Sequence, residues 1–117
     1  MNMGRFSLRL IGRLRDVRGR DEFVGPLGHI ATAHNIPVAE LESRLAELAG
    51  LERGPVVLVC RTDKRSAMAA RTLRAAGFTQ VNVLRRGMEQ WNETGLPAEG
   101  AGAETTARAN TARGTIL

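Results

Sequence analysis

Residues 56–77 read VVLVCRTDKRSAMAARTLRAAG, and this stretch decides the fold class. Its first four residues are apolar and follow Gly54-Pro55, a pattern typical of a short buried strand. From Ser66 onward the stretch consists largely of Ala, Leu, Met and Arg, which favour a helix, and Gly77 marks the end of that helix. The sequence therefore predicts a strand, a polar loop and a helix over residues 66–76.

Cys60, the only cysteine in the chain, ends the predicted strand and begins the loop. In open α/β folds, ligands bind at the carboxyl ends of strands, and the free N–H groups at a helix N-terminus favour an anion. Arg61, Lys64 and Arg65 add positive charge, and each of these influences favours the thiolate form of Cys60. A cysteine that merely closes a core strand is the alternative interpretation, and the basic loop argues against it.

The segments on both sides of this loop resemble the rhodanese family of sulfurtransferases. Segments similar to the first-half signature of that family are Asp16-Val17-Arg18, Asp21-Glu22-Phe23, Gly28-His29-Ile30 and Asn35-Ile36-Pro37. Segments similar to its closing signature are Leu84, residues 85–91 and Gly95-Leu96-Pro97. Several weak motifs in the family's order are more specific than any one of them.

The resemblance implies a single-domain rhodanese-like protein. Its α/β fold would have three layers, with helices flanking a central, mainly parallel sheet. Residues 16–98 would form the rhodanese-like domain. Residues 99–117 are rich in Ala, Gly, Thr and Arg, a composition that predicts a disordered tail. A strand, helix and strand over residues 56–83 predict a right-handed parallel crossover.

Residues 1–15 depart from the family pattern. Apolar and polar side chains alternate over residues 6–15, which is typical of an edge or half-buried strand. Gly12-Arg13-Leu14-Arg15 is too basic for the buried central strand that the family has here. We therefore expect a basic N-terminal segment and a shortened start of the fold. An exposed sheet edge at this segment would invite pairing with a second copy as a homodimer.

Two further helices are indicated. Val38, Leu41, Leu45 and Leu48 recur at helical spacing, which predicts an amphipathic helix over residues 38–49 whose apolar side packs in the core. A short helix is expected over residues 87–94, with Trp91 as a core anchor. Arg86, which precedes this helix, replaces a glycine of the family pattern and adds a cation near the loop.

The resemblance also implies the chemistry. The Cys60 thiolate would attack the outer sulfur of a donor such as thiosulfate, and the resulting persulfide would pass its sulfur to a thiol or cyanide. Backbone N–H groups of the loop would form an anion-binding nest. The substrate-binding set is Arg61, Thr62, Asp63, Lys64, Arg65 and Ser66. Asp16, Arg18 and Arg86 would support the site structurally without taking part in catalysis.

Details of the loop refine this expectation. Four residues separate Cys60 from Arg65, whereas related phosphatases and arsenate reductases have five, so the short loop suits a sulfur atom better than a phosphate. Asp63 stands where many family members have Gly or a neutral residue. Its carboxylate would either lower activity toward an anionic donor or cap the following helix.

Composition limits the partners. The net charge is +5, but the chain has no Tyr, three Phe and one Trp, so it lacks a stacking platform for nucleic acid. No apolar run approaches the length of a membrane span. A single cysteine fits a reducing, cytoplasmic setting, and one cysteine with two histidines predicts neither a metal site nor a cofactor.

The expected partners are therefore a small anionic sulfur donor and a thiol or cyanide acceptor, the acceptor thiol being that of a small molecule or a protein. Two alternatives remain open. The chain could be a catalytically weak rhodanese-like binding or regulatory module, or a sulfur carrier whose true acceptor is a protein.

Overall fold

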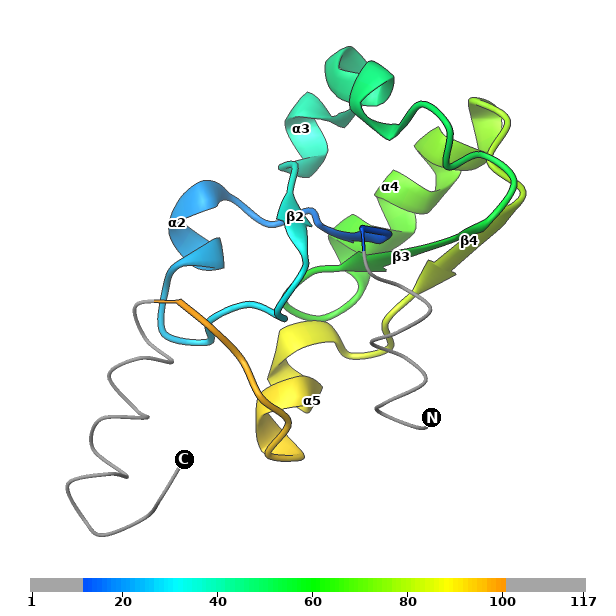
Figure 1. The fold of residues 1–117 in the computed structure, drawn as a ribbon. Coiled ribbons are helices and arrows are strands. Elements are labelled where there is room, and N and C mark those ends of the chain that lie inside the picture. The colour runs from blue at the N-terminus through cyan, green and yellow to red at the C-terminus, as the bar shows by residue number, and fades with distance from the viewer. Residues whose placement is uncertain (1–11, 101–117) are drawn as a thin grey trace, which may run out of the picture.

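The computed structural model of the chain describes residues 12–100. Its elements are β1 (Leu14–Asp16), α2 (Arg20–Phe23), β2 (His34–Asn35), α3 (Val38–Leu41), the 3₁₀ helix η1 (Glu42–Leu48), β3 (Pro55–Val59), α4 (Lys64–Ala75), β4 (Gln80–Val83) and α5 (Gly87–Glu93). The four strands form one parallel sheet in the order β2-β1-β3-β4 (Figure 1). The predicted parallel crossover from β3 through α4 to β4 is confirmed.

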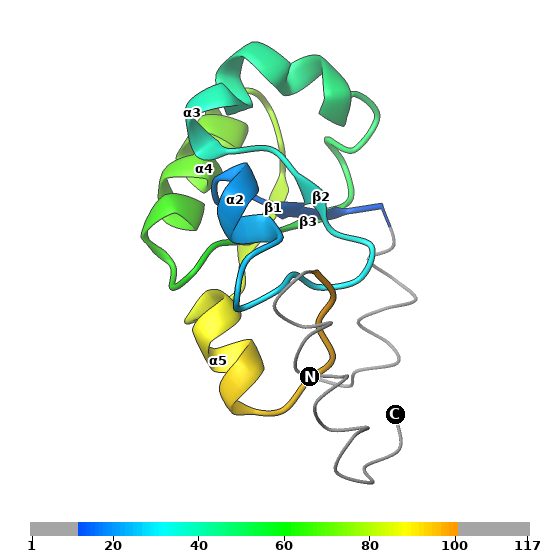
Figure 2. The same ribbon diagram turned by 90° about the vertical axis from the view of Figure 1, so that its left-hand side faces the viewer.

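Helices cover both faces of the sheet. The side chains of β3 alternate between the two faces, so that each face presents apolar residues that a helix can bury. Val56 and Leu58 pack with the buried side chains of α3, η1 and α4, whereas Val57 and Val59 pack with those of α5. Figure 2, which views the sheet nearly edge-on, shows α3 and α4 on one side and α5 on the other. The predicted three-layer α/β fold is therefore confirmed.

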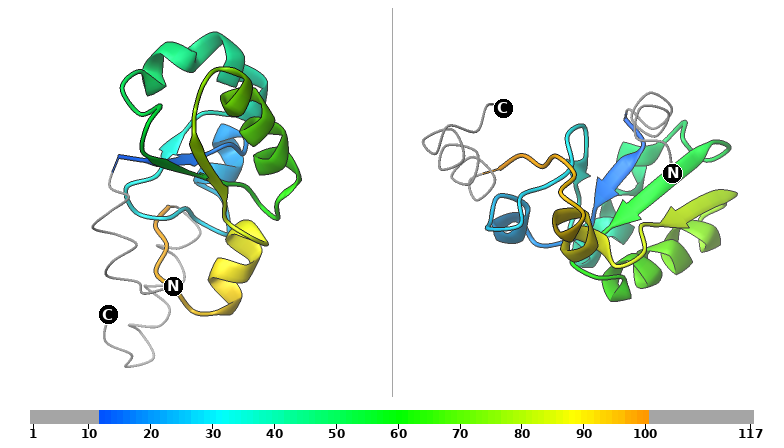
Figure 3. Two further views of the ribbon diagram at one scale, coloured as in Figure 1. Left: turned by 90° about the vertical axis from the view of Figure 1, so that its right-hand side faces the viewer. Right: turned by 90° about the horizontal axis from the view of Figure 1, so that it is seen from below.

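The carboxyl ends of the strands all lie at one edge of the sheet. In the right-hand view of Figure 3 the arrowheads of β1, β3 and β4 point toward the end where α2 and α5 lie. The loop that begins at Cys60 leaves β3 at this edge. The fold thus brings the first-half signature, the cysteine loop and the closing signature to the same end of the molecule.

The prediction for the segment before Asp16 is wrong where the structure describes it. β1 is not an edge strand: it pairs with β2 on one side and with β3 on the other, and all three of its residues are buried. The outer strands are β2 and β4. The expected exposed edge is therefore not at β1, and residues 1–11 lie outside the described part.

Arg15 explains why a basic segment can form a central strand. The residue is only 5% exposed. Its Nη1 donates hydrogen bonds to the carbonyl oxygens of Gly12 at 2.9 Å and Leu14 at 3.2 Å. Burial lowers the pKa of Arg15 from its ordinary value, and the negative charge of Glu47 opposes that effect. Backbone carbonyls thus solvate one end of the guanidinium, whereas the buried Nε has no hydrogen-bond partner among the described residues.

The predicted helix over residues 38–49 is divided in two. α3 ends at Leu41 and continues as the 3₁₀ helix η1, with Arg44 outside the helical region at φ −116° and ψ 18°. The Ser43 hydroxyl donates to the carbonyl oxygen of Glu40 at 2.9 Å and so competes with the helical backbone. Leu41 and Leu48 are nevertheless buried as predicted.

Glu99, which the sequence assigns to a tail, pairs with His29 through two backbone hydrogen bonds of 2.6 and 2.7 Å. Residues 101–117 of that tail lie outside the described part. Within residues 12–100, no helix is long and apolar enough to cross a membrane.

Candidate active site

Cys60 lies at the carboxyl end of β3 and is 1% exposed. Its carbonyl oxygen accepts a hydrogen bond of 2.9 Å from the backbone N–H of Met88 in α5. The thiol is therefore held where three elements meet: the end of β3, the start of α4 and the start of α5.

The loop after Cys60 presents unpaired hydrogen-bond donors. The backbone N–H groups of residues 61–63 donate no hydrogen bond to any other residue in the range 12–100. Those of Lys64, Arg65 and Ser66 belong to the first turn of α4, where a helix has no internal acceptors for them. Such a run of free N–H groups, together with the positive end of the helix dipole, can bind an anion.

Ser66 adds a side-chain donor to this set. The residue is 0% exposed, and its Oγ has no hydrogen-bond partner among the described residues. A buried hydroxyl without a partner costs about 1–3 kcal/mol. Because the serine is in the first turn of α4, six residues after Cys60, it is a candidate donor to a sulfur or oxygen atom bound by the loop.

Asp63 does not cap the helix. It occupies the position before α4, which begins at Lys64 rather than at Ser66, and its side chain makes no capping hydrogen bond. The carboxylate is exposed instead. The capping interpretation is thus wrong, and the effect of this charge on a donor stays a prediction.

Both arginines of the loop have carboxylate partners on neighbouring helices. The Arg61 Nε donates to Oε2 of Glu89 in α5 at 2.6 Å. Arg65 makes a bidentate pair with Glu22 in α2, at 2.6 Å from Nη1 and 2.9 Å from Nη2. The hydrogen bonds to Arg65 hold the pKa of Glu22 well below its usual range, at about 2. Lys64, by contrast, has no ion pair within residues 12–100.

Asp16 and Arg18 form a buried ion pair behind the loop. Arg18 Nη2 lies 2.6 Å from Asp16 Oδ2, and the two side chains are 1% and 0% exposed. Arg18 also donates to the carbonyl oxygens of Glu22 at 3.1 Å and Gly28 at 2.7 Å. The pair therefore ties the end of β1 to α2 and to the segment before β2.

The turn before α5 is fitted closely to the cysteine loop. Arg86 adopts a left-handed conformation with φ 60°, and its side chain pairs with Glu93 at 3.3 Å. Gly87 follows with φ 48°, and a Cβ atom there would lie 2.0 Å from the Cys60 carbonyl oxygen and 2.5 Å from that of Thr62. Only glycine allows α5 to approach the half-buried Thr62 and Cys60 in this way.

Sequence reasoning missed Glu22, Glu89 and the contact role of Gly87. All three residues lie in segments that are similar to the family, but no spacing rule connects any of them to Cys60. Glu22 and Arg65 are 43 residues apart in the chain. A pair so distant in sequence becomes visible only when the topology places α2 beside the start of α4.

A buried cysteine that begins a short loop at the carboxyl edge of a parallel sheet defines the class of this site. The family profile for the rhodanese-like domain matches residues 6–94. The chain therefore belongs to the rhodanese-like family. In residues 12–100, no group of three or more His, Cys, Asp or Glu side chains is arranged to hold a metal ion.

Relatives of known name are moderately similar to the chain. Uncharacterized protein YqhL of Bacillus subtilis strain 168 is 42% identical over 79 residues, which are 68% of this chain and 60% of that protein. The thiosulfate:glutathione sulfurtransferase of Homo sapiens is 36% identical over 101 residues, covering 74% of this chain and 86% of that protein.

The fold also matches a solved sulfurtransferase. The structure of the human single-domain sulfurtransferase TSTD1 aligns with a TM-score of 0.65 and 31% identity, over 78% of this chain and 89% of that one. The chain is thus a rhodanese-like domain with sulfurtransferases among its relatives. It spans less than two thirds of the length of the Bacillus subtilis protein.

Proposed function

We propose that the chain is a sulfurtransferase that carries sulfane sulfur as a persulfide on Cys60. The observation that carries the proposal is the set of unpaired donors in the stretch that follows Cys60: the free backbone N–H groups of residues 61–66 and the unpartnered Ser66 hydroxyl. The relatives described above include a thiosulfate:glutathione sulfurtransferase. The proposed donor is a small anion such as thiosulfate.

The reaction proceeds in two displacement steps. The Cys60 thiolate attacks the outer sulfur of thiosulfate, a new S–S bond forms, and the old S–S bond breaks so that sulfite leaves with its electron pair. An acceptor thiolate or cyanide then attacks the terminal sulfur of the persulfide. The Cys60 thiolate is released with the electron pair of that S–S bond and is ready for another cycle.

The loop supplies the electrostatics of both steps. Its N–H groups and the Ser66 hydroxyl hold the anionic terminal sulfur and the oxygens of the donor. Lys64 attracts the donor as a cation without a carboxylate partner, and Arg65 stabilises the departing sulfite. The Asp16–Arg18 pair, with Arg86 before α5, keeps the surrounding backbone in place.

Initial-rate kinetics test the proposal. With thiosulfate and cyanide varied in turn, a persulfide intermediate requires ping-pong behaviour, that is, parallel lines in a double-reciprocal plot. Cys60→Ser should abolish turnover while leaving the unfolding temperature near that of the wild type. Intersecting lines, or turnover that survives in Cys60→Ser, would exclude the covalent mechanism.

A catalytically weak binding or regulatory module is a second candidate. Two observations favour it: Cys60 is almost fully buried, and carboxylates neutralise both loop arginines. This candidate predicts a free thiol that gains no sulfur from thiosulfate. A chain that accepts sulfur only from a protein persulfide would instead be a dedicated carrier with a protein acceptor.

A further inference from the structure

Within residues 12–100, the carboxylate of Glu22 makes the hydrogen bonds that join α2 to the residues after Cys60. Glu22 is part of a four-residue helix in which no residue is fully buried, and the half-buried Phe23 beside it stacks on His29. Glu22 itself is held by polar contacts: its Oε1 accepts from the Gly19 backbone N–H at 3.2 Å, and its carbonyl oxygen accepts from Arg18. Arg18 is in turn anchored by the buried carboxylate of Asp16.

A continuous chain of polar contacts therefore runs from the sheet to the loop. It begins at Asp16 in β1, passes through Arg18 to α2, and reaches Arg65 through the carboxylate of Glu22. Arg65 is the second residue of α4, one position before Ser66. The hydrogen bonds that Arg65 donates to Glu22, together with the negative charge of that carboxylate, raise the pKa of Arg65.

The bidentate geometry leaves part of the guanidinium available. Glu22 takes one N–H from Nη1 and one from Nη2 of Arg65. The Nε–H of Arg65 makes no hydrogen bond within residues 12–100. A guanidinium has five N–H donors in a rigid plane, so one carboxylate can fix its orientation while the other edge meets a second anion.

We propose that Glu22 is a positioning residue for sulfur transfer, which holds the Arg65 guanidinium, and with it the start of α4, in the arrangement that receives the donor and the leaving sulfite. The inference rests on the proposed function and adds to it a residue on a different element. Glu22 itself touches no reacting atom and acts through Arg65.

Two opposing effects of Glu22 give the proposal a distinctive kinetic signature. Its negative charge repels an anionic donor, and at this partly exposed position the repulsion changes donor affinity by only about two- to threefold. Its fixing of Arg65 matters more, because misplacing a group that stabilises transition-state charge costs about tenfold or more in rate. Glu22→Gln should therefore bind thiosulfate slightly better and react more slowly.

The experiment is a double-substitution cycle on the full chain, with Glu22→Gln, Arg65→Gln and the combined variant. Single-turnover reaction with thiosulfate gives the limiting rate and the half-saturating concentration. Glu22→Gln should lower the limiting rate about tenfold in the presence of Arg65 and change it less than about twofold when Arg65 is already replaced. An equal loss in both backgrounds, or no loss in either, would overturn the proposal.

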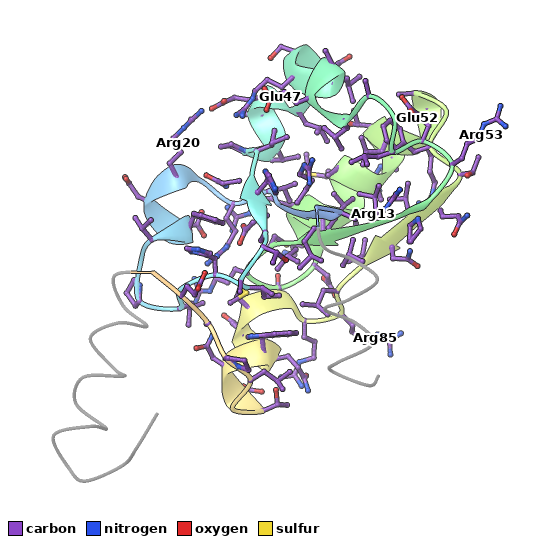
Figure 4. All side chains as sticks on the ribbon, in the orientation of Figure 1. Arg13, Arg20, Glu47, Glu52, Arg53 and Arg85 are labelled. Atoms are coloured by element: carbon purple, nitrogen blue, oxygen red, sulfur yellow. The ribbon has the colours of Figure 1, made fainter. Side chains whose placement is uncertain are left out.

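Two further variants separate charge from geometry. Glu22→Asp keeps the charge but is too short to hold both nitrogens of Arg65, so the limiting rate should fall without any gain in donor affinity. Glu40→Gln is the matched control: it removes a carboxylate of α3 that pairs at 2.5 Å with Arg20 of α2, the helix that also carries Glu22, and its rate should equal that of the wild type. Figure 4 shows Arg20 on the outer side of α2.

Hydrogen exchange of the backbone N–H of Ala67, which donates to the Asp63 carbonyl oxygen at 2.9 Å at the start of α4, provides a readout that needs no sulfur transfer. Glu22→Gln should accelerate exchange at least about threefold when Arg65 is present and leave it unchanged when Arg65 is replaced. If the wild type gains no sulfur but exchange shows this coupling, the proposed function fails, while the part of the inference in which Glu22 holds Arg65 and the start of α4 in place stands. If the wild type is persulfidated but the effect of Glu22→Gln on the limiting rate and on hydrogen exchange is the same with and without Arg65, the positioning role fails.

Discussion

Ser66 is the residue at which stability and function are expected to separate. Its buried hydroxyl has no partner among residues 12–100, so it lowers stability in the free protein. Ser66→Ala should leave the free energy of unfolding unchanged or raise it by up to about 1 kcal/mol, and should slow sulfur uptake by Cys60. Chemical denaturation measures the free energy of unfolding, and single-turnover kinetics measure the rate of sulfur uptake.

Ser43→Ala is the matched control for this variant. The Ser43 hydroxyl is exposed and donates to a backbone carbonyl far from the loop, so the rate of sulfur uptake should not change. A clear loss of stability in Ser66→Ala would show that the hydroxyl has a partner in solution, and would contradict its assignment as a group reserved for the bound sulfur.

Lys64 is expected to govern attraction of the donor. It is the one cation of the loop without a carboxylate partner in the described part of the chain, and it is exposed. Lys64→Met should raise the KM for thiosulfate about three- to tenfold, with a smaller effect at high salt, because the loss is mainly Coulombic. Steady-state kinetics at two ionic strengths measure the change.

Arg53→Met provides the same change of charge at a distant site. Figure 4 shows Arg53 projecting from the end of the molecule opposite to α2. Its KM should stay within about twofold of the wild type, since screening weakens charges beyond one Debye length. If both variants raised KM equally, the overall charge and not Lys64 would attract the donor.

The reactive residue could be predicted from sequence, but most of its partners could not. Cys60 and the loop form one continuous stretch whose strand, polar residues and helix formers are read directly. Glu22 and Glu89 contact the loop from other elements. In the sequence, nothing distinguishes them from Glu40, a surface carboxylate that is also paired with an arginine. Only their placement beside Arg65 and Arg61 distinguishes them.

At the scale of elements, the start of α5 is the tightest contact of the site. Gly87→Ala would bring a Cβ atom within 2.0 Å of the Cys60 carbonyl oxygen in a backbone that already has φ 48°. We expect a loss of about 3 kcal/mol or more, because backbone must move and a left-handed residue is strained. Thermal unfolding measures the loss.

Gly95→Ala serves as the control for Gly87→Ala. Gly95 also has a positive φ, of 76°, but a Cβ atom there meets nothing within 4 Å. It should cost only about 1–2 kcal/mol, the penalty of the left-handed conformation by itself. Equal losses in the two variants would indicate that the close approach of α5 to the loop contributes nothing.

The elements that were predicted correctly are those whose pattern is local. β3, α4 and β4 follow from apolar runs, helix formers and glycine stops. β1 was assigned wrongly because an arginine is expected at the surface. In the fold Arg15 is buried, and backbone carbonyl oxygens accept hydrogen bonds from its guanidinium. α3 was predicted too long because the Ser43 hydroxyl competes with the backbone.

For the whole molecule, the Glu22–Arg65 pair predicts a pH dependence of stability. The pKa of Glu22 lies at about 2 in the folded protein, below the ordinary 4.5, so its contribution is complete above about pH 4.5 and is lost as the pH falls toward 2. The pair is partly exposed, and we expect a contribution of less than about 1 kcal/mol.

Urea unfolding of the wild type and Glu22→Gln at pH 7, 5 and 3 tests this dependence. The difference in free energy of unfolding should be constant from pH 7 to 5 and smaller at pH 3. In an Arg65→Gln background the difference should be smaller at pH 7 and vary less with pH. A difference that grew as the pH fell would contradict the assignment of the pair.

The order of elements in the molecule was predictable because each family-like segment occupies its place along the chain. The contacts of α2 and α5 with the loop could not be predicted from the sequence, because neither contact depends on a local pattern. These contacts join the first-half signature and the closing signature to one thiol at the edge of the sheet.

The most direct test of the account is the intact mass of the protein after incubation with thiosulfate, beside a Cys60→Ala control. The account predicts a gain equal to one sulfur atom, absent from the control and removed by cyanide. A wild-type protein whose Cys60 is shown to be a free thiol, and which gains no mass, would contradict the proposed sulfur transfer from thiosulfate.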